Sequence, residues 1–485
     1  MNLLSDHLLL ISSILIFAAV LVTKVGYRYG VPSLLLFLIL GMLAGEDVLG
    51  VKFDDFEAAE SIGHFAMTII LFTAGLETSI KETRPVLRQG AILSTIGVLL
   101  TVVFTGIFVW LVFGSPRNAT LISCLLLAAV MGSTDSASVF SVLRGKKLHL
   151  RENLGPMLEL ESGSNDPMAY MLTIIFIQLI PDAHGVARVG SVVWSGVLTL
   201  LLQIIVGVAV GFAVGFAARW VLGRLQLAGS ALYSIFILST GFFANGFAGL
   251  LMGNGLLALY IAAIIIGNRS DLPHRKEVLN FFDGMTWLMQ LVMFLMLGLL
   301  ARPSRMLPMI FPALLIGVFM MFVARPASVF LSLLPFKGQS FRAKTFASWV
   351  GLKGAGPILF ALCPVVAGLQ GAEDMFNIVF IITLFSLLLQ GMTLRPVARM
   401  LRLSYDEDPK AETFGMEIPE QMGMLRDHTV TEEDLLRGAT LRDLGLPHGI
   451  RVMMVRRGDS YLVPHGSMPL QVGDRLVIIM GDSDD

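Results

Sequence analysis

The 485-residue sequence has little charge, little cysteine and no excess of either sign. Only 15% of its residues are charged, whereas a soluble chain of this size carries about 25%, which excludes an ordinary soluble protein. The formal net charge of −1 gives no indication of a nucleic-acid partner. The two cysteines, Cys124 and Cys363, lie in apolar runs, so we expect buried thiols rather than a disulfide.

The N-terminal region also lacks the basic segment and the small-residue cleavage site of a signal peptide. We therefore expect its apolar run to be retained as a membrane span. Hydrophobic residues make up 55% of the chain, and the mean hydropathy is +0.77. Apolar runs of about 20 residues, long enough to cross a bilayer, recur from Leu8 to Leu401. These features predict an all-α polytopic membrane protein.

Polar residues, glycine and proline divide this region into thirteen candidate transmembrane helices. They are expected at residues 8–25, 31–49, 61–80, 86–113, 119–142, 155–180, 191–221, 231–249, 253–268, 279–300, 307–334, 344–367 and 375–398. Short cytoplasmic loops are enriched in Lys and Arg. Loops after odd-numbered spans contain 21 basic residues, with Arg325 counted among them, and the opposite loops contain five. The N-terminus is therefore predicted outside the cytoplasm and the C-terminus inside it.

The membrane region also resembles itself at an offset of about 222 residues. The matching positions are Gly45 with Gly267, Gly75 with Gly298, and Gly132 with Gly354. This offset corresponds to seven spans, and because seven is odd the second copy must run through the membrane in the opposite sense. Inverted repeats of this kind, here two six-helix copies, are typical of secondary transporters with binding sites near the membrane midplane.

The repeat pairs the fifth span with the twelfth, and both are interrupted in their middle. The fifth contains "GSTDS" and the twelfth contains "GLKGAGP", whose glycines and proline do not continue a regular helix. Irregular backbone at membrane depth is tolerated only inside protein or beside a cavity. We therefore predict two crossing broken helices that expose carbonyl groups and helix ends to an ion.

The sixth span contains "ESGSND", which places two carboxylates at membrane depth. On a helix Glu161 and Asn165 share one face, and Ser162 and Asp166 form a neighbouring pair. Ionisable groups within a membrane are costly and indicate function. Burial favours the protonated form of a carboxylate, so one such group could bind either a proton or a monovalent cation.

Structural roles remain open for several of these residues. Glu161 could form an ion pair with Lys353 that only joins the sixth and twelfth spans. Asp135 could serve as a helix N-cap in "STDS". Asn165 could only form a structural hydrogen bond between helices. Asp166 is hardest to explain in this way, because no structural role requires a second carboxylate at that place.

With "STDS" in one broken span, "ESGSND" in the next span and "GLKGA" in the other broken span, the chain resembles the bacterial NhaP-type monovalent cation/proton antiporters over essentially all of residues 1–400. The resemblance implies a homodimer with a dimerisation region and a mobile ion-carrying core in the bacterial inner membrane. It implies that Asp166 carries both cation and proton, with the monovalent cation bound at Asp166 and Asp135. Thr134 is implied to be a neighbour of the site and Ser162 a hydroxyl ligand.

The same resemblance implies that Glu161 pairs with Lys353 and that Asn165 is hydrogen-bonded between them. An Asn rather than a second Asp before Asp166 resembles members that exchange one cation for one proton. The "GLKGA" form is more similar to the potassium/proton antiporters. Thr73 stands where many relatives have an acidic residue, which also favours K⁺ over the smaller and more strongly hydrated Na⁺.

The composition changes after Arg402, the last residue of the transmembrane domain expected at 1–402. Residues 403–424 form an acidic linker, and residues 425–485 alternate strand-like runs with turns, which predicts a small α+β domain. This segment resembles the TrkA-C (RCK C-terminal) domain. The resemblance implies a regulatory domain that binds a small ligand of unknown identity, and a structural dimerisation module remains an alternative.

Taken with the resemblance, the sequence predicts a K⁺/H⁺ antiporter that works by alternating access and is not an enzyme. We expect no required cofactor, with K⁺ or Na⁺ and H⁺ as substrates, and membrane lipid and a second copy of the chain as partners. A Na⁺/H⁺ antiporter with the same site is the nearest alternative. A potassium channel is disfavoured because no "TVGYG"-like filter is present.

Overall fold

The computed structural model describes residues 3–29, 31–114, 120–135, 139, 148–180, 189–227, 229–269, 272–336, 338–406, 425–435, 440–444, 450–457 and 460–480. Contacts divide the chain into a membrane unit, Met1–Tyr405, and a C-terminal unit, Asp406–Asp485. Each unit is described by itself below.

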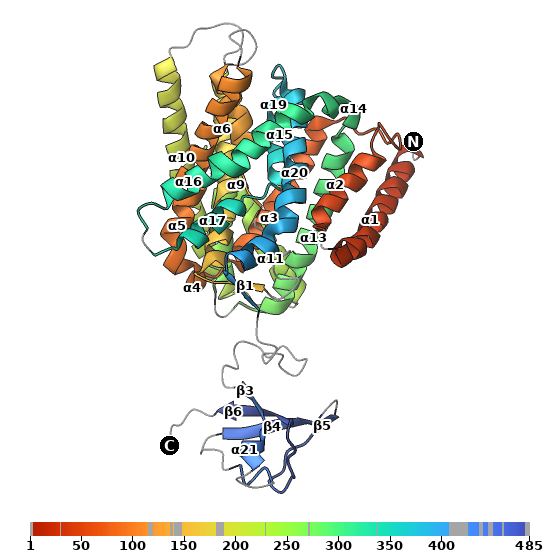
Figure 1. The fold of residues 1–485 in the computed structure, drawn as a ribbon, viewed down its shortest axis with the longest axis vertical. Helices are drawn as coiled ribbons and strands as arrows, with labels where there is room; N and C mark the ends of the chain where they lie inside the picture. The colour runs from red at the N-terminus through yellow and green to blue at the C-terminus, as the bar shows by residue number, and fades with distance from the viewer. Residues whose placement is uncertain are drawn as a thin grey trace. The chain divides into compact units, whose positions relative to one another are not determined.

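The membrane unit is built of helices, several of which are interrupted (Figure 1). The first copy of the repeat and the helix that follows it comprise α1 (Leu3–Tyr29), α2 (Ser33–Ala44), α3 (Phe56–Glu77), α4 (Ile80–Thr83), η1 (Arg84–Val86), α5 (Leu87–Ile92), η2 (Leu93–Gly97), α6 (Val98–Phe113), α7 (Leu121–Val130), α9 (Leu154–Leu179) and α10 (Val189–Leu222). The second comprises α11 (Ser230–Leu250), α12 (Gly255–Gly267), α13 (Arg275–Leu300), α14 (Pro303–Met306), η3 (Leu307–Met309), α15 (Ile310–Phe319), η4 (Met320–Ala324), α16 (Arg325–Ser332), α17 (Phe341–Trp349), α18 (Ala355–Phe360), α19 (Leu362–Val366) and α20 (Ala372–Met400).

Most of these helices belong to stretches that have the length and composition of membrane spans. Among the described residues, seven continuous helical stretches are long and apolar enough to cross a bilayer, and five shorter apolar helices accompany them. Helix α9 is long enough but carries the polar residues of "ESGSND". The all-α membrane fold is thus confirmed, and helix falls within each of the thirteen predicted spans. The number of membrane crossings itself stays a prediction.

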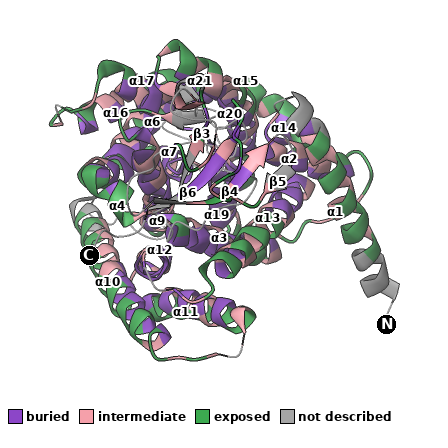
Figure 2. Cartoon of the chain, turned by 90° about the horizontal axis from the view of Figure 1, so that it is seen from below, coloured by how far each residue is buried: buried purple, intermediate pink, exposed green. Residues whose placement is uncertain are grey.

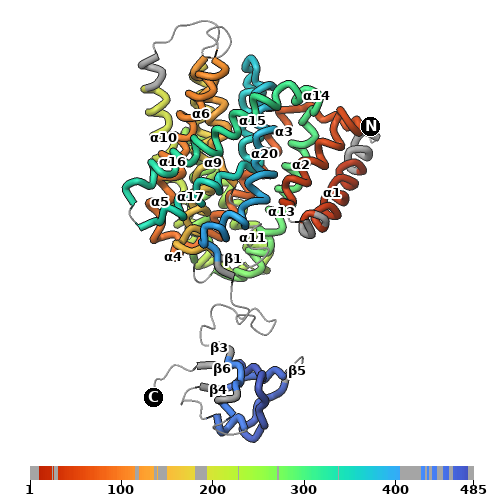
Figure 3. The backbone as a smooth tube through the Cα atoms, in the orientation of Figure 1, coloured from red at the N-terminus to blue at the C-terminus, as the bar shows by residue number. Residues whose placement is uncertain are grey.

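The outer helices expose apolar side chains, as expected where lipid surrounds a protein. Phe17 of α1, Trp194 and Phe216 of α10 and Phe243 of α11 are all more than half exposed. Figure 2 shows this as green on α1, α10 and α11 around a purple interior. Figure 3 traces the backbone, with α1, α2 and α13 side by side near the N-terminus. Cys124 and Cys363 are buried free thiols, as predicted.

The inverted repeat is visible in how the helices pack. Helix α2 lies against α13. Their counterparts in the other copy, α12 for α2 and α3 for α13, lie against each other in the same way. At both places a glycine lets two backbones meet, because a Cβ there would collide with a carbonyl oxygen of the facing helix. The contacts are those of Gly298 with Leu38 and Gly41, and of Gly75 with Tyr260 and Ala263. Leu38, Gly41 and Gly298 of the first contact correspond to Tyr260, Ala263 and Gly75 of the second, at the offset of about 222 residues seen in the sequence.

A second symmetric contact joins the fourth and eleventh spans. Each span contains one π-helical segment, η2 in the first copy and η4 in the second. Thr101 and Ser328 each lie four residues after their segment, and their hydroxyl oxygens are 2.7 Å apart. The two copies therefore meet at residues that each lie four positions after the π-helical segment of their own copy.

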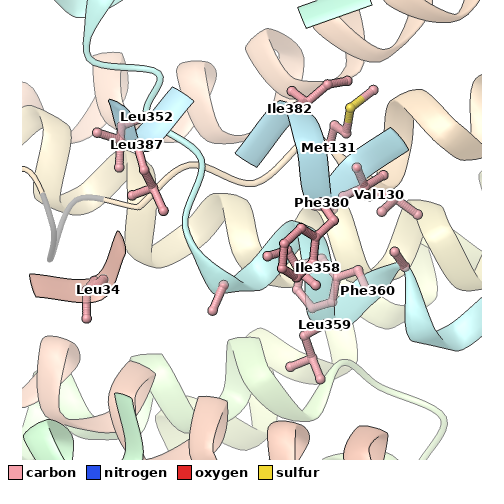
Figure 4. Packing of buried hydrophobic residues seen from close by; sticks show 14 of the residues in the cluster. Leu34, Val130, Met131, Leu352, Ile358, Leu359, Phe360, Phe380, Ile382 and Leu387 are labelled. Atoms are coloured by element: carbon pink, nitrogen blue, oxygen red, sulfur yellow. The ribbon is translucent and has the colours of Figure 1, made fainter. Parts of the chain in front are cut away.

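The twelfth span packs its second half into the centre of the unit. Ile358 and Phe360 of α18 lie among Val130 of α7 and Phe380 of α20, all of them almost fully buried (Figure 4). Close packing on all sides fixes where α18 begins. It thereby fixes the irregular segment that precedes it, residues 351–354.

The C-terminal unit is a small sheet domain, as predicted. Its antiparallel sheet has the order β3 (Leu425–Thr429), β6 (Arg475–Met480), β4 (Ile450–Arg457) and β5 (Ser460–Leu462), with the short helix α21 (Glu432–Leu435). Leu476 and Ile478 alternate inward along β6 and pack with Val455 of β4. The predicted linker begins with β2 (Ser404–Asp406), which pairs with β1 (Leu148–Leu150); residues 407–424 lie outside the described residues.

Candidate functional site

The two interrupted spans cross at their breaks. Helix α7 ends at Val130 and is followed by an irregular segment at 131–135, while α17 ends at Trp349 before the irregular segment 351–354. The backbone N–H of Asp135 donates to the carbonyl oxygen of Leu352 at 2.8 Å. The Nζ of Lys353 donates to the carbonyl oxygen of Ser133 at 2.9 Å. These bonds confirm the predicted crossing, although residues 136–138 and 140–147 lie outside the described residues.

Helix α9 presents one polar face to the first break. Ser133 Oγ donates to Asp166 Oδ1. Asn165 Nδ2 donates to Thr134 Oγ1 at 2.5 Å, and Ser162 Oγ donates to the carbonyl oxygen of Thr134 at 2.7 Å. The spacing of Ser162, Asn165 and Asp166 on a helix is what allows all three to reach residues 133–134.

A cavity of about 60 Å³ lies beside these groups. On its polar side it is lined by residues of the breaks and of α9, namely Ser133, Thr134, Asp135, Ser162, Gly163, Asp166, Ala355 and Gly356. Its opposite wall comes from α3 and α13, namely Met67, Ile70, Leu71, Ala74, Gln290, Met293 and Phe294. Gln290 is the one polar side chain of that wall. The predicted site residues Asp166, Asp135, Thr134 and Ser162 therefore line one cavity.

The donor set of this cavity is made of oxygen atoms. Carboxylate, hydroxyl and carbonyl oxygens are the ligands that hard cations prefer. A volume of about 60 Å³ holds a few water molecules, and so a partly hydrated monovalent ion. Asp166 has no ion pair among the described residues and only one hydrogen bond, from Ser133. Its carboxylate can therefore accept either a proton or a cation.

The predicted ion pair between Glu161 and Lys353 is wrong. Glu161 pairs with Arg325 instead, through a contact between Glu161 Oε1 and Arg325 Nη2. The side chain of Glu161 is 1% exposed and that of Arg325 is 5% exposed. Arg325 begins α16 directly after the π-helical segment η4, within the eleventh span. Arg325 also falls within the span predicted at 307–334, so it does not belong among the loop cations. Without it the asymmetry of basic loop residues is 20 to five.

The predicted places of Lys353 and Asn165 change accordingly. Lys353 is 3% exposed and binds the carbonyl oxygen of Ser133, the residue whose hydroxyl touches Asp166. Lys353 is thus a positioning residue for the first break. Asn165 is bound to Thr134 rather than placed between Glu161 and a lysine.

Sequence reasoning missed three residues of this region. Arg325 is counted among the loop cations, Gln290 is not predicted to lie at the site, and Ser133 appears only as part of the broken span. Thr73, used as an argument for K⁺, donates to the carbonyl oxygen of Ile69 in its own helix and does not line the cavity. That argument therefore has no support in the geometry of the site.

An inverted repeat, two crossing helix breaks and carboxylates on a midmembrane cavity define a secondary ion transporter rather than an enzyme. Residues 11–400 match the family model "Sodium/hydrogen exchanger, transmembrane", and residues 425–484 match the TrkA-C domain. The chain therefore belongs to the sodium/hydrogen exchanger family, with a C-terminal TrkA-C domain.

Several curated proteins are similar over nearly the whole chain. The K(+)/H(+) antiporter NhaP2 of Shewanella sp. (strain ANA-3) is 38% identical over 97% of this chain and 80% of its own. The K(+)/H(+) antiporter NhaP of Alkalimonas amylolytica is 34% identical with the same coverage. The solved structure of the sodium proton antiporter MjNhaP1 from Methanocaldococcus jannaschii at pH 8 has a TM-score of 0.68 at 21% identity, covering 83% of this chain and 99% of its own. That structure supports the fold.

Proposed function

We propose that this chain exchanges one K⁺ for one H⁺ across a bacterial inner membrane by alternating access. The observation that carries the proposal is the position of Asp166, which lines an oxygen-rich cavity between two crossing breaks and has no ion pair among the described residues. Asp135, Thr134 and Ser162 line the same cavity and are the proposed neighbours of the cation.

Coupling follows from a single carboxylate that binds either substrate. An ionised and empty Asp166 is costly to move through an apolar surrounding, whereas the protonated or cation-bound form is close to neutral and can move. The two substrates compete for one group, so neither can cross uncoupled. Asn165, rather than a second carboxylate, precedes Asp166, which supports exchange of one charge for one charge.

The names of the relatives support K⁺ as the cation, since the two similar antiporters above are both named for K⁺ and H⁺. Na⁺/H⁺ exchange at the same site is the second candidate. It is favoured by the Na(+)/H(+) antiporter 1 of Methanocaldococcus jannaschii, which is 25% identical over 73% of this chain.

We further propose the surroundings in which the transporter works. It is a homodimer in membrane lipid, with its N-terminus on the periplasmic side and its TrkA-C domain in the cytoplasm, as the distribution of basic loop residues supports. The TrkA-C domain responds to a small ligand and regulates exchange. No cofactor and no nucleic acid take part.

Dye-loaded vesicles containing the purified protein test this function. After a pH gradient is imposed, added K⁺ should dissipate it at lower concentration than Na⁺, and no exchange should follow when an impermeant cation is added. A lower half-saturating concentration for Na⁺ than for K⁺ would favour the second candidate. Absence of any cation-driven proton movement would contradict both.

A further inference from the structure

A second and larger cavity lies on the far side of α9 from the ion site. Its volume is about 450 Å³, and it is bounded by the stretch from α4 to η2 and by α9, α10 and α12. Leu160, Ser164, Pro167, Met168 and Met171 line it from α9, whereas Ser162, Gly163 and Asp166 of the same helix face the ion cavity. Cavities of this size with a mostly apolar lining and a few polar groups are typical ligand sites.

The length of this cavity matches one leaflet of a bilayer. From Leu160 to Met171 a helix rises by about 17 Å, and half of a bilayer's hydrocarbon core measures about 15 Å. The lining residues begin at Thr78, directly after α3 and near the predicted cytoplasmic loop, and reach Ile204 within α10. One extended acyl chain therefore fits along the cavity.

A basic side chain, that of Arg84, lies at the end of the cavity next to the predicted cytoplasmic loop. Arg84 lines the cavity, and Lys81 and Arg88 precede and follow it by three and four residues, so the three share one helical face. All three are exposed, and no ion pair or hydrogen bond involves their side chains in the part of the chain that the structure describes. No carboxylate is among the residues that line the cavity.

We propose that this cavity binds an anionic phospholipid, with one acyl chain in the cavity and the phosphate at Arg84. Basic pockets between transmembrane helices are known as sites for anionic headgroups, and an apolar cavity at membrane depth is favourably filled by an acyl chain. The observations are independent of the ion that is exchanged, so the proposal goes beyond the transport function.

A lipid in this place would touch both α9, which carries Asp166, and α12. These helices also meet directly, since Gly163 lies against the ring of Tyr260 and Asn254 Nδ2 donates to the carbonyl oxygen of Pro167 at 3.2 Å. The bound chain would extend this contact and resist movement of α9 along α12. The lipid therefore acts on the rate of exchange and leaves the ion site itself unchanged.

Native mass spectrometry of the purified protein, after exchange into detergent with defined lipids, measures this binding. We expect retention of phosphatidylglycerol in preference to phosphatidylcholine. Arg84→Ala should weaken retention about fivefold, which corresponds to about 1 kcal/mol for one basic side chain. Ala91→Phe, which fills the cavity, should remove retention while Arg84 stays in place.

Two controls separate this site from general effects. Arg88→Ala removes the same charge from the same helical face outside the cavity, and Leu99→Phe adds an aromatic ring to the lipid-facing side of α6. Both should retain the lipid more strongly than the matched cavity variants. Equal loss in Arg84→Ala and Arg88→Ala, equal retention of the two phospholipids, or unchanged retention in Ala91→Phe would overturn the proposal.

Discussion

Two carboxylates on α9, five residues apart, are held in opposite ways. Glu161 is paired with Arg325 in a closed contact away from the cavity. Asp166 lines the cavity and receives one hydrogen bond from a hydroxyl group. The same chemical group on one helix is thus fixed in one place and available in the other.

The difference shows what a carrier group requires. A carboxylate that is neutralised by an arginine has no reason to bind a cation or a proton, because the guanidinium already supplies the opposite charge. A carboxylate beside hydroxyl groups and water needs such a partner. The proposed carrier role of Asp166 therefore rests on the absence of an ion pair at its carboxylate among the described residues, rather than on the presence of a carboxylate alone.

The largest effect is expected where the available carboxylate is removed. Asp166→Asn has the same shape but cannot alternate between charged and neutral forms, so exchange should fall by at least about a hundredfold. Cation-driven dequenching in vesicles measures it, and the thermal stability should stay near that of the wild type. Glu159→Gln, a change on the same helix away from the cavity, is the control. Substantial exchange by Asp166→Asn would place the carrier elsewhere, at Asp135 first.

The second effect concerns the fixed carboxylate. Arg325→Met leaves Glu161 buried without its partner and should lower the free energy of unfolding by about 3–5 kcal/mol. Thermal unfolding in detergent measures the loss. The double variant Arg325→Met with Glu161→Met should recover most of it, since no buried charge remains. A double variant as unstable as the single one would show that the two residues do not form an isolated pair.

A smaller change is expected at the apolar wall opposite Asp166. Gln290→Met keeps the length of the side chain but removes the amide group of a residue that lines the cavity, so the apparent affinity for K⁺ should weaken by about threefold to tenfold. The K⁺ dependence of exchange at two pH values measures it. Thr286→Val, one turn away and outside the cavity lining, is the control. Unchanged affinity would mean that the polar side alone holds the cation.

The smallest effect is expected for an arginine–carboxylate pair outside the membrane. In the TrkA-C domain Arg457 donates to both carboxylate oxygens of Asp474, at 2.9 and 2.7 Å. The hydrogen bond from Arg457, together with the backbone N–H of Gln471, lowers the pKa of Asp474 below its usual value. Asp474→Asn should therefore cost the domain about 1–2 kcal/mol of stability.

The pH dependence of this last effect has a definite sign. Because the folded pKa is the lower one, the stabilisation is fully present above the unfolded pKa of about 3.9 and is lost as pH falls through the folded value. Hydrogen exchange of residues 425–480 in the full chain measures it, with Asp443→Asn as a control. Equal protection of wild type and Asp474→Asn at neutral pH would contradict the expectation.

Much of the site was predictable because its residues share short motifs. The helical spacing in "ESGSND" and the glycines of "GLKGAG" indicate which groups face one another and where the helices break. Partners that come from distant spans were not predictable in this way. The sequence around Arg325 does not show which acidic residue it meets, and Gln290 is one polar residue in an apolar helix. Only the packing of α16 and α13 brings these two residues to α9 and to the cavity.

The mirrored glycine contacts also determine which part of the molecule can move. Helices that meet backbone to backbone, as α2 with α13 and α3 with α12, have few side chains between them to rearrange. We therefore expect these four helices to stay in place during transport, with the apolar side of α3 and α13 turned to the ion cavity. We expect displacement in α9 and the two breaks, because the side that they face offers few polar groups to bind them. Among the described residues that line the cavity from α3 and α13, Gln290 is the one polar side chain along this path.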